Sequence, residues 1–472
     1  MKYSVLLILF IISLHLVALG QDGQKVLDFN TYMQRVQEHH PMAKAATLSP
    51  DKGKAYLLNA RGAFDPKAYG NLRQKMYDGL RYYHLPEVGL RIPTWFGMEL
   101  ESGYSRYSGQ YLNPENKQPE NGLGFLGISI PIGQGLFIDE RRTELKMAQN
   151  YLELTREEQR RMLNDLLYMA GQAYWSWFEL HHSALIYKKA RELAELRFDF
   201  VRQSVYLGDR SPFDTLEARI QVQNRELVWR KAEMERMKAA LKLSLYLWHD
   251  GLIPLELDSL TSPVSMEVAN LMPLSTRNVS SDSLLANHPE LNMRRINIAK
   301  QGIERRWKRE QIKPSINLKY NALSRTNYEY SMSHPDWNNY QFAVQVSTPL
   351  FLRKQRGELK LADLKIQESM LKLESQKLSV KREVETAFIA RDYNLEQVLL
   401  SEENVRDLAA LVQGERRLFQ SGESSLFMIN SREVMFISAS IQLLQNMAEL
   451  RNSDLQWAYA GGILTDMYTS IP

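Results

Sequence analysis

The side chains best suited to metal binding occur in this sequence as two adjacent histidine pairs, His39-His40 and His181-His182. Neighbouring residues on a helix point away from each other, and a metal site on one helix needs an i, i+4 spacing that these pairs lack. Cysteine is absent, which excludes disulfides, thiol catalysis and a lipid-modified N-terminal cysteine. The methionines fall mainly at periodic helical positions, which is typical of packing. We therefore expect no metal site.

No motif in the chain points to catalysis. The sequence has no nucleotide-binding glycine loop, no nucleophile elbow and no zinc motif. We expect no catalytic residue, no cofactor and no enzymatic activity. The formal net charge is only +4, with Lys and Arg nearly balanced by Asp and Glu, and this argues against a nucleic-acid partner.

A small group of charges, Arg210, Asp214 and Glu217, lies in the stretch GDRSPFDTLEAR at residues 208–219. A glycine and a proline break a long helical pattern here, and the pattern then resumes. Charges at the start of a helix are most often solvated side chains.

The same stretch has an echo, GESSLFMINSRE at residues 422–433. Gly, Ser and Phe keep their places at a separation of 214 residues. The charges do not, because Met428 and Ser431 stand where the first copy has Asp214 and Glu217. The two copies therefore differ in charge at this turn.

The echo belongs to a repeat that covers most of the chain. His40-Pro41 recurs as His288-Pro289, and Pro66 recurs as Pro314, both 248 residues apart. Agreement of these His-Pro pairs and prolines at a fixed spacing indicates internal duplication. The spacing falls from 248 to 214 between Pro66 and Glu144, so the first copy carries about 34 extra residues there.

Each copy ends in two long helical stretches. Apolar residues recur at every seventh position, as from Phe213 to Trp248, which predicts helices packed along their length as in a coiled coil. At 1.5 Å per residue, the stretch from Asp139 to Tyr206 would be on the order of 100 Å long. We expect hairpins over residues 138–248, turning at 208–212, and over 353–462, turning at 420–425. The aromatic run AYWSWFEL, residues 173–180, is expected to be packing core.

Alternating stretches precede these helices, at about residues 66–132 and 314–350. Ten-residue alternation flanked by Tyr and Trp is typical of a strand of an outer-membrane barrel, although alternation alone also fits a water-soluble antiparallel sheet. The second insert supplies two strands with a polar, aromatic loop between them. The first supplies either two with an enlarged loop or four. Residues 249–283 form a Pro- and Ser-rich link between repeats 21–248 and 284–465.

The N-terminus predicts export. One lysine is followed by an apolar run of roughly 15 residues and a small-residue exit near Gly20, which suits a cleaved signal peptide over residues 1–20. The alternative is an N-terminal membrane anchor, for which the run is short. No later segment is apolar enough for a membrane helix.

With these features the chain resembles the TolC-like outer membrane efflux and secretion proteins. The most specific carriers are YLGDRSPFDTLEARIQVQNRELVWRKAEMERMKAALKLSLY and its counterpart SGESSLFMINSREVMFISASIQLLQNMAELRNSDLQWAYAGG. The resemblance implies a mainly α fold with a β insert in each repeat: a long antiparallel coiled-coil helical barrel and a transmembrane β-barrel, completed by homotrimerisation. Each chain would give four strands to the shared barrel. Open strand edges are not tolerated in lipid, which agrees with assembly.

The resemblance also implies partners and sites. It places the chain in the outer membrane, extending into the periplasm, as a passive exit duct that works with a periplasmic adaptor and an inner-membrane pump, proton-driven or of the ABC type. The turns would form the periplasmic tip and meet the adaptor; the same residues can also be read as simple helix terminators. The expected docking residues are Leu207, Gly208, Asp209, Ser211, Pro212, Phe213, Gly422, Glu423, Ser425 and Phe427. Family members often close the tip with acidic and basic side chains near this turn, a pattern from which the second copy departs at Met428 and Ser431, so a closing network built on that copy is in doubt. Arg210, Asp214 and Glu217 are the candidate gate charges, with solvated helix-start charges as the alternative. The alternative class is a non-transporting, coiled-coil structural or adhesive envelope protein.

Overall fold

The computed structural model describes residues 25–258, 260–273, 281–325 and 336–468. The expected signal peptide, linker residues 274–280 and loop residues 326–335 lie outside the described residues. The chain folds as two units. Unit 1 comprises Met1–Ala46, Arg160–His288 and Ser379–Pro472, and unit 2 comprises Thr47–Gln159 and Pro289–Leu378.

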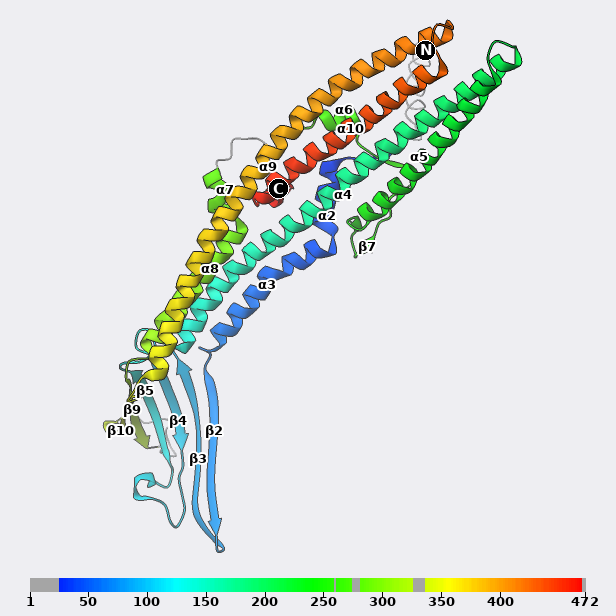
Figure 1. Cartoon of the computed structure of the whole chain (residues 1–472). Helices are drawn as coiled ribbons and strands as arrows, with labels where there is room; N and C mark the ends of the chain where they lie inside the picture. The colour runs from blue at the N-terminus through cyan, green and yellow to red at the C-terminus, as the bar shows by residue number, and fades with distance from the viewer. Residues whose placement is uncertain (1–24, 259, 274–280, 326–335, 469–472) are drawn as a thin grey trace, which may run out of the picture. The chain divides into compact units, whose positions relative to one another are not determined.

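Four long helices dominate the chain. They are α4 (Glu140–Tyr206), α5 (Pro212–Ser244), α9 (Arg353–Gln420) and α10 (Leu426–Ala460). In unit 1, α5 returns beside α4 and α10 returns beside α9, so the chain makes two antiparallel hairpins (Figure 1). Among the described residues, no helix has a stretch both long and apolar enough to span a bilayer.

Shorter elements complete unit 1. Strand β1 (Lys25–Leu27) pairs in parallel with β8 (Thr261–Pro263), and β6 (Trp248–His249) pairs with β7 (Ile253–Pro254). The short helices are α2 (Phe29–His39), α6 (Met266–Leu271), α7 (Ser281–Asn287) and α11 (Leu464–Tyr468).

The core of unit 1 is aromatic. Tyr174, Trp175, Trp177 and Phe178 are all at most 2% exposed, so the packing role predicted for the AYWSWFEL run is confirmed. The hydroxyl of Tyr174 donates to the carbonyl of Leu27 at 2.7 Å, which supplies the partner that a buried phenol needs.

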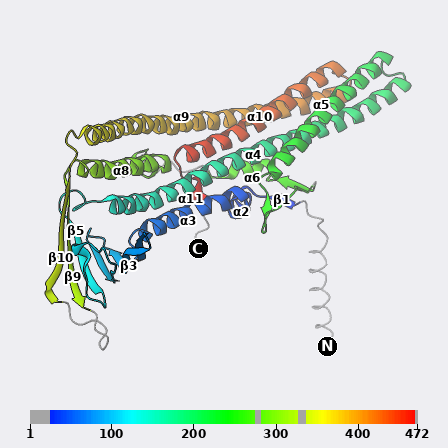
Figure 2. The ribbon, with the colours of Figure 1, turned by 90° about the horizontal axis from the view of Figure 1, so that it is seen from below.

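Unit 2 joins helices to one sheet. Its helical parts include α3 (Pro41–Gly62) from Thr47 on and α8 (Pro289–Glu310). Figures 1 and 2 show α8 beside α9, and ion pairs connect them, Lys308 to Glu358 at 2.8 Å among them. The strands are β2 (Lys67–Tyr77), β3 (Leu80–Pro93), β4 (Glu99–Ser105), β5 (Leu123–Pro131), β9 (Ser315–Arg325) and β10 (Asp336–Ser347).

The sheet has six strands in the order β10-β9-β5-β4-β3-β2, and every neighbouring pair is antiparallel. The first insert thus supplies four strands, which answers the open question of two or four. The sheet has six strands where the resemblance implied four per chain, because the extra residues of the first copy form a hairpin that pairs on both sides. Asp78 and Gly79, with φ of 52° and 73°, make the tight turn between β2 and β3.

Candidate functional sites at the hairpin turns and in the sheet

The first hairpin turn is set by backbone hydrogen bonds around Gly208. After α4 ends, the Gly208 N–H donates to the Val205 carbonyl at 3.1 Å and the Asp209 N–H donates to the Ser204 carbonyl at 2.9 Å. Gly208 has φ of 85°, a left-handed conformation in which a side chain would be strained. Together these features form a Schellman motif, which satisfies the last carbonyls of the helix.

The second turn repeats this geometry. The Gly422 N–H donates to the Phe419 carbonyl at 3.3 Å and the Glu423 N–H donates to the Leu418 carbonyl at 2.8 Å. Gly422 has φ of 79°. The two turns that repeat in the sequence thus have the same backbone conformation.

Both returning helices begin with a serine cap. The Phe213 N–H donates to the Ser211 hydroxyl at 3.3 Å, and the Met428 N–H donates to the Ser425 hydroxyl at 3.2 Å. Pro212 is the first residue of α5 and needs no hydrogen-bond partner for its nitrogen. The caps fix where α5 and α10 begin.

One buried cluster joins the two hairpins below their turns. It consists of residues from α4, α5, α9 and α10: Val201, Ala218, Phe419, Leu426 and Ile429, all at most 5% exposed. Since each of the four helices contributes, the hairpins of unit 1 pack as one body here.

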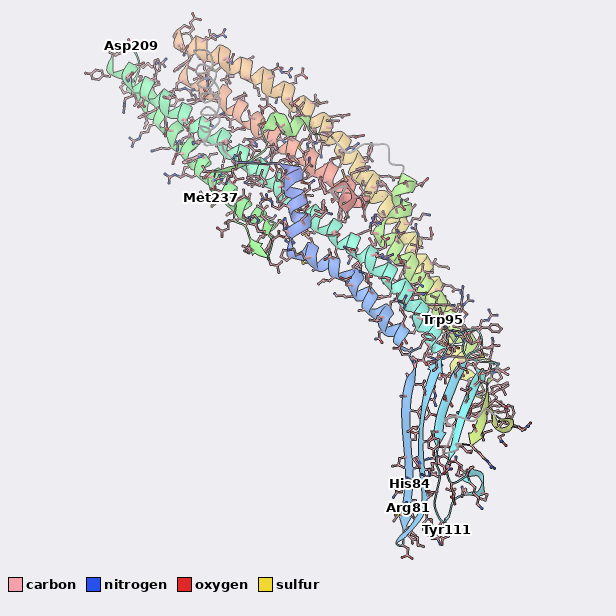
Figure 3. The ribbon with its side chains drawn as sticks, turned by 180° about the vertical axis from the view of Figure 1, so that it is seen from behind. Arg81, His84, Trp95, Tyr111, Asp209 and Met237 are labelled. Carbon is pink, nitrogen blue, oxygen red and sulfur yellow. The ribbon has the colours of Figure 1, made fainter. Side chains whose placement is uncertain are left out.

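Beyond this cluster the turns present exposed apolar side chains. Phe213 is 80% exposed, Leu207 73% and Phe427 69%. Figure 3 shows Asp209 at the free end of the α4–α5 hairpin, in unit 1. Exposed rings that fill no pocket of their own chain are available to a partner. The docking role of the ten predicted turn residues stays a prediction.

The candidate gate charges do not form a network within the chain. The Arg210 guanidinium lies over the ring of Phe419, 4.3 Å from its centroid. Within the described part of the chain, Asp214 and Glu217 take part in no ion pair, and both are half-buried. Their role in closing the tip stays a prediction.

The ion pairs that do connect the hairpins centre on Glu433. Arg197 of α4 lies 2.5 Å from the Glu433 carboxylate of α10, and Arg416 of α9 lies 3.1 Å from it. Arg197 also donates to the Asn430 side chain at 2.8 Å. The Arg197 and Glu433 side chains are 12% and 10% exposed, so this pair is largely withdrawn from water. The comparison of Met428 and Ser431 with the first copy missed this carboxylate.

A further arginine makes the same region electropositive. Burial lowers the pKa of Arg225 on α5, the negative charge of Glu433 raises it in part, and the positive charge of Arg197 lowers it again. The Glu433 carboxylate thus interacts with three guanidinium groups, with Arg197 and Arg416 in ion pairs and with Arg225 through its charge. We call Arg197, Arg225, Arg416 and Glu433 the interhairpin charge cluster. Glu433 stood inside the quoted echo, but no spacing rule links it to an arginine 236 residues away.

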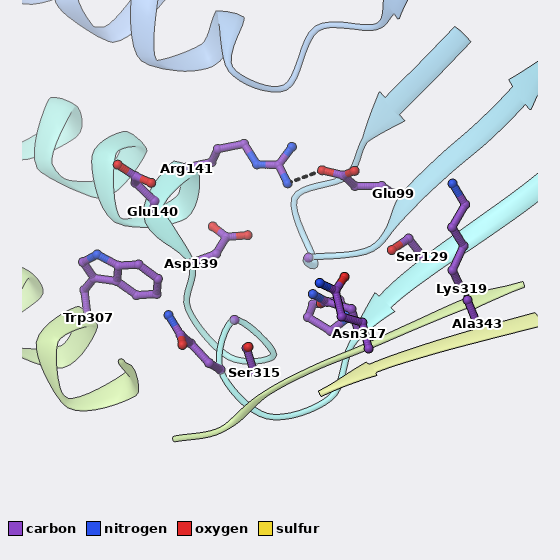
Figure 4. Close-up of a pocket in the computed structure, with 15 residues that line it drawn as sticks. Glu99, Ser129, Asp139, Glu140, Arg141, Trp307, Ser315, Asn317, Lys319 and Ala343 are labelled. Carbon is purple, nitrogen blue, oxygen red and sulfur yellow. Dashed lines mark hydrogen bonds and ion pairs between the residues drawn. The ribbon is translucent and has the colours of Figure 1, made fainter. Parts of the chain in front are cut away.

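In unit 2 a polar cavity of about 660 Å³ opens on one face of the sheet (Figure 4). Arg141 at the start of α4 donates to Glu99 of β4 at 2.5 Å, the contact drawn in Figure 4. On the same face Glu101 receives Arg91 at 2.8 Å and also pairs with Lys319. This face is lined by charged and amide side chains.

The opposite face is apolar and exposed. One row of paired residues runs Ile92, Leu100, Ile128, Tyr320 and Phe342 across five strands. Leu72, Val88, Phe342, Val344 and Val346 are each more than half exposed. A contiguous apolar face of this kind is not stable in water and marks a surface covered by lipid or protein. The apolar and polar residues that alternate along the strands thus lie on opposite faces of the sheet.

Aromatic residues flank the sheet at both ends. Trp95 is 80% and Phe96 58% exposed in the turn between β3 and β4, and Figure 3 shows Trp95 at the end of the sheet next to the helices of unit 2. Tyr111, 53% exposed, and Arg81 lie at the far end of the sheet in the same view. Rings of this kind sit at the two interfaces of a membrane.

The histidine pairs have packing roles. The His182 ring lies 2.9 Å from the Val264 carbonyl, and His39 pairs with Asp250 at 3.0 Å. Burial, with the positive charges of His182 and Arg236, lowers the pKa of His181 to about 4, against a weaker opposing effect of Glu233. Among the residues that the structure describes, no group of three His, Asp or Glu side chains is placed to hold a metal ion.

Comparison with known proteins finds a family model that matches part of the chain. Residues 281–458 match the family model described as outer membrane efflux protein. No curated protein sequence matches the chain.

Solved structures share the fold over almost the whole chain. The open state of the MtrE outer membrane channel of Neisseria gonorrhoeae aligns with a TM-score of 0.67 at 14% identity, over 92% of this chain and 88% of that one. The CmeC outer membrane channel of Campylobacter jejuni aligns with a TM-score of 0.63 at 13% identity, over 92% and 85%. The outer membrane protein VceC of Vibrio cholerae aligns with a TM-score of 0.61 at 13% identity, over 92% and 95%. The resemblance to the TolC-like family is thereby confirmed.

Proposed function

We propose that this chain, which carries an outer membrane efflux protein domain, is one subunit of a homotrimeric outer-membrane exit duct for a tripartite efflux or type I secretion system. One observation carries the proposal: a six-stranded sheet with an exposed apolar face and a charged opposite face occurs in one chain with helices of 67 and 68 residues. Lipid covers the first face, and water fills the space on the second.

The duct is passive. Its polar face carries charges of both signs that pair with one another, Glu99 with Arg141 and Glu101 with Lys319. Solutes move down their gradient through the lumen, and an inner-membrane pump supplies the driving force. The family of the matched domain is one of channels rather than enzymes.

The hairpin turns are the docking end. Phe213 and Phe427 project from two turns of the same backbone geometry, so a trimer presents six similar apolar ends to a periplasmic adaptor. The interhairpin charge cluster holds the two hairpins of one subunit together below these ends. Opening of the tip requires the hairpins to move apart, and the Arg197–Glu433 pair opposes that movement.

The rival function is a coiled-coil structural or adhesive envelope protein. Such a protein needs the long helices but has no use for a sheet with an exposed apolar face. Membrane fractionation followed by single-channel recording on purified protein separates the two. The duct predicts outer-membrane localisation, a trimer in detergent and stepwise conductance; trimers that insert but never conduct would sink it.

A further inference from the structure

We infer that each subunit contributes all six strands to the barrel, and that β2 pairs with β10 of the neighbouring copy to close it. Three copies of a six-stranded sheet make a wall of eighteen strands. The inference rests on the proposed homotrimer. It differs from the four strands per chain that the resemblance implied.

The hydrogen-bond register shows that β3 and β4, the extra hairpin of the first copy, are continuous with the rest of the sheet that would form the barrel wall. One row of paired residues runs without a break across all six strands: Lys67, Arg91, Glu101, Gly127, Asn321 and Gln341. A hairpin that only leaned on a four-stranded wall would not share this register with both neighbours.

The strands of the first insert also share the two faces of the sheet. Val88 and Leu90 of β3 and Leu100 of β4 are 56%, 39% and 41% exposed on the apolar face. On the polar face, Glu101 of β4 binds Arg91 of β3 and Lys319 of β9. Alternation in phase with the rest of the sheet puts β3 and β4 between lipid and lumen.

Glycines on the polar face let aromatic rings cover the inserted strands. A Cβ on Gly89 of β3 would come 2.8 Å from the Tyr69 ring, and a Cβ on Gly103 of β4 would come 2.6 Å from the Phe125 ring. Each ring therefore lies directly over a glycine, at a place where the Cβ of any other residue would clash with it. This close packing ties β2 to β3 and β4 to β5.

The two edges are suited to each other. All residues of β2 except Tyr69 are exposed, and so is β10 from Asn338 on. These edges are 11 and 12 residues long and carry no proline to block pairing. Strand β2 follows α3 and β10 precedes α9, and six antiparallel strands put the two edges in opposite directions. Joining them between copies continues the antiparallel pattern without a break.

An eighteen-stranded barrel is wide. Diameter grows roughly linearly with strand number, so this barrel would be about one and a half times as wide as one with four strands per subunit. Barrels of this strand number enclose an aqueous channel. The passage of large solutes would then be limited by the helical part of the duct and not by the barrel.

The absence of cysteine makes a cross-linking test direct. Asn71→Cys in β2 is combined in turn with Gln341→Cys, Ala343→Cys and Gln345→Cys in β10. These three positions lie on the polar face and sample three registers of β2 against β10 of the neighbouring copy. The matched control, Ser105→Cys in β4, shares a row with Asn71 and is combined with the same three partners.

We expect oxidation in native membranes to give covalent trimers with at least one Asn71 pair and only monomers with the Ser105 pairs. Trimers through Ser105, or no cross-link at any Asn71 pair, would overturn the six-stranded wall. A chain that is not a trimer in detergent before oxidation would instead refute the proposed duct.

A second measurement does not depend on register. Leu72→Cys and Asn71→Cys lie on opposite faces of β2, and we expect a water-soluble maleimide to modify Asn71→Cys at least tenfold faster in membranes. Equal, fast modification of both thiols would show that β2 stands in water outside the wall.

Discussion

The guanidinium of Arg197 lies 2.5 Å from the carboxylate of Glu433, although 236 residues separate them in the chain. This pair connects α4 of the first hairpin to α10 of the second. Both side chains are nearly buried, so the loss of either one leaves an uncompensated charge in the helix packing.

Replacing Glu433 by Gln should loosen the two hairpins. Removing one partner of a buried ion pair costs about 3–5 kcal/mol, and here it leaves the charges of Arg197, Arg225 and Arg416 to repel one another. We expect faster backbone amide exchange around Val201 and Ile429, measured by mass spectrometry, and a higher open probability in single-channel recordings.

The matched control is Glu423→Gln in the exposed second turn, which should leave exchange and conductance unchanged. Arg416→Gln should have an intermediate effect, because its side chain is 39% exposed and its pair is weaker. A Glu433→Gln channel with normal exchange would contradict the structural role of the pair.

Replacing Gly208 or Gly422 by alanine should lower the free energy of unfolding by the same amount. A Cβ on Gly208 or Gly422 meets no atom within 4 Å, so the cost is that of left-handed backbone alone, about 1–2 kcal/mol. Gly414 inside α9 is equally open but helical, and alanine there should stabilise by about 0.5–1 kcal/mol. Thermal unfolding of the three variants in detergent measures both signs; a stabilising Gly208→Ala would contradict the turn.

The exposed rings of Phe213 and Phe427 should matter for adaptor binding but not for folding. Aspartate at either position should reduce adaptor capture in cells by about tenfold or more, because hot-spot aromatic contacts contribute at least ~1.4 kcal/mol. The unfolding temperature should not change. Tyrosine at the same positions keeps the ring and should retain capture, whereas capture by both aspartate variants would place the docking surface elsewhere.

Acid should destabilise unit 1 through His181. The unfolded chain takes up a proton near the usual histidine pKa of 6.5, whereas the folded chain keeps the His181 imidazole neutral down to about pH 4. Between these values the unfolded state binds more protons, so stability falls as pH falls. His181→Leu should reduce the drop in unfolding temperature between pH 7 and pH 5. Exposed His249→Leu is the control and should leave the drop unchanged.

The positions of the hairpin turns could be predicted from local patterns in the sequence. The glycine break at Gly208 and its echo at Gly422 located both turns, and the structure has a left-handed glycine and a serine cap at each, because these features depend on a few neighbouring residues. The buried role of Trp175 and Trp177 was readable from helical periodicity for the same reason.

Contacts between residues far apart in the chain could not be predicted from the sequence. Glu433 finds Arg197, and Arg210 finds Phe419, only after four helices are brought together. A single sequence contains no rule that selects one arginine from many. The number of strands was also undecided, because about 34 extra residues fit an enlarged loop as well as the paired strands that the structure contains.

Two backbone hydrogen bonds and one glycine determine the shape of each turn, and the side chains of Asp209, Arg210 and Glu423 take no part in those bonds. Substitution of Asp209 or Glu423 therefore costs little folding stability, whereas substitution of Arg210 also loses its contact with the Phe419 ring. The ends of the hairpins can change their chemistry over evolution while their shape stays constant, so the two halves of the duplication can adapt separately to the same partner or to different ones.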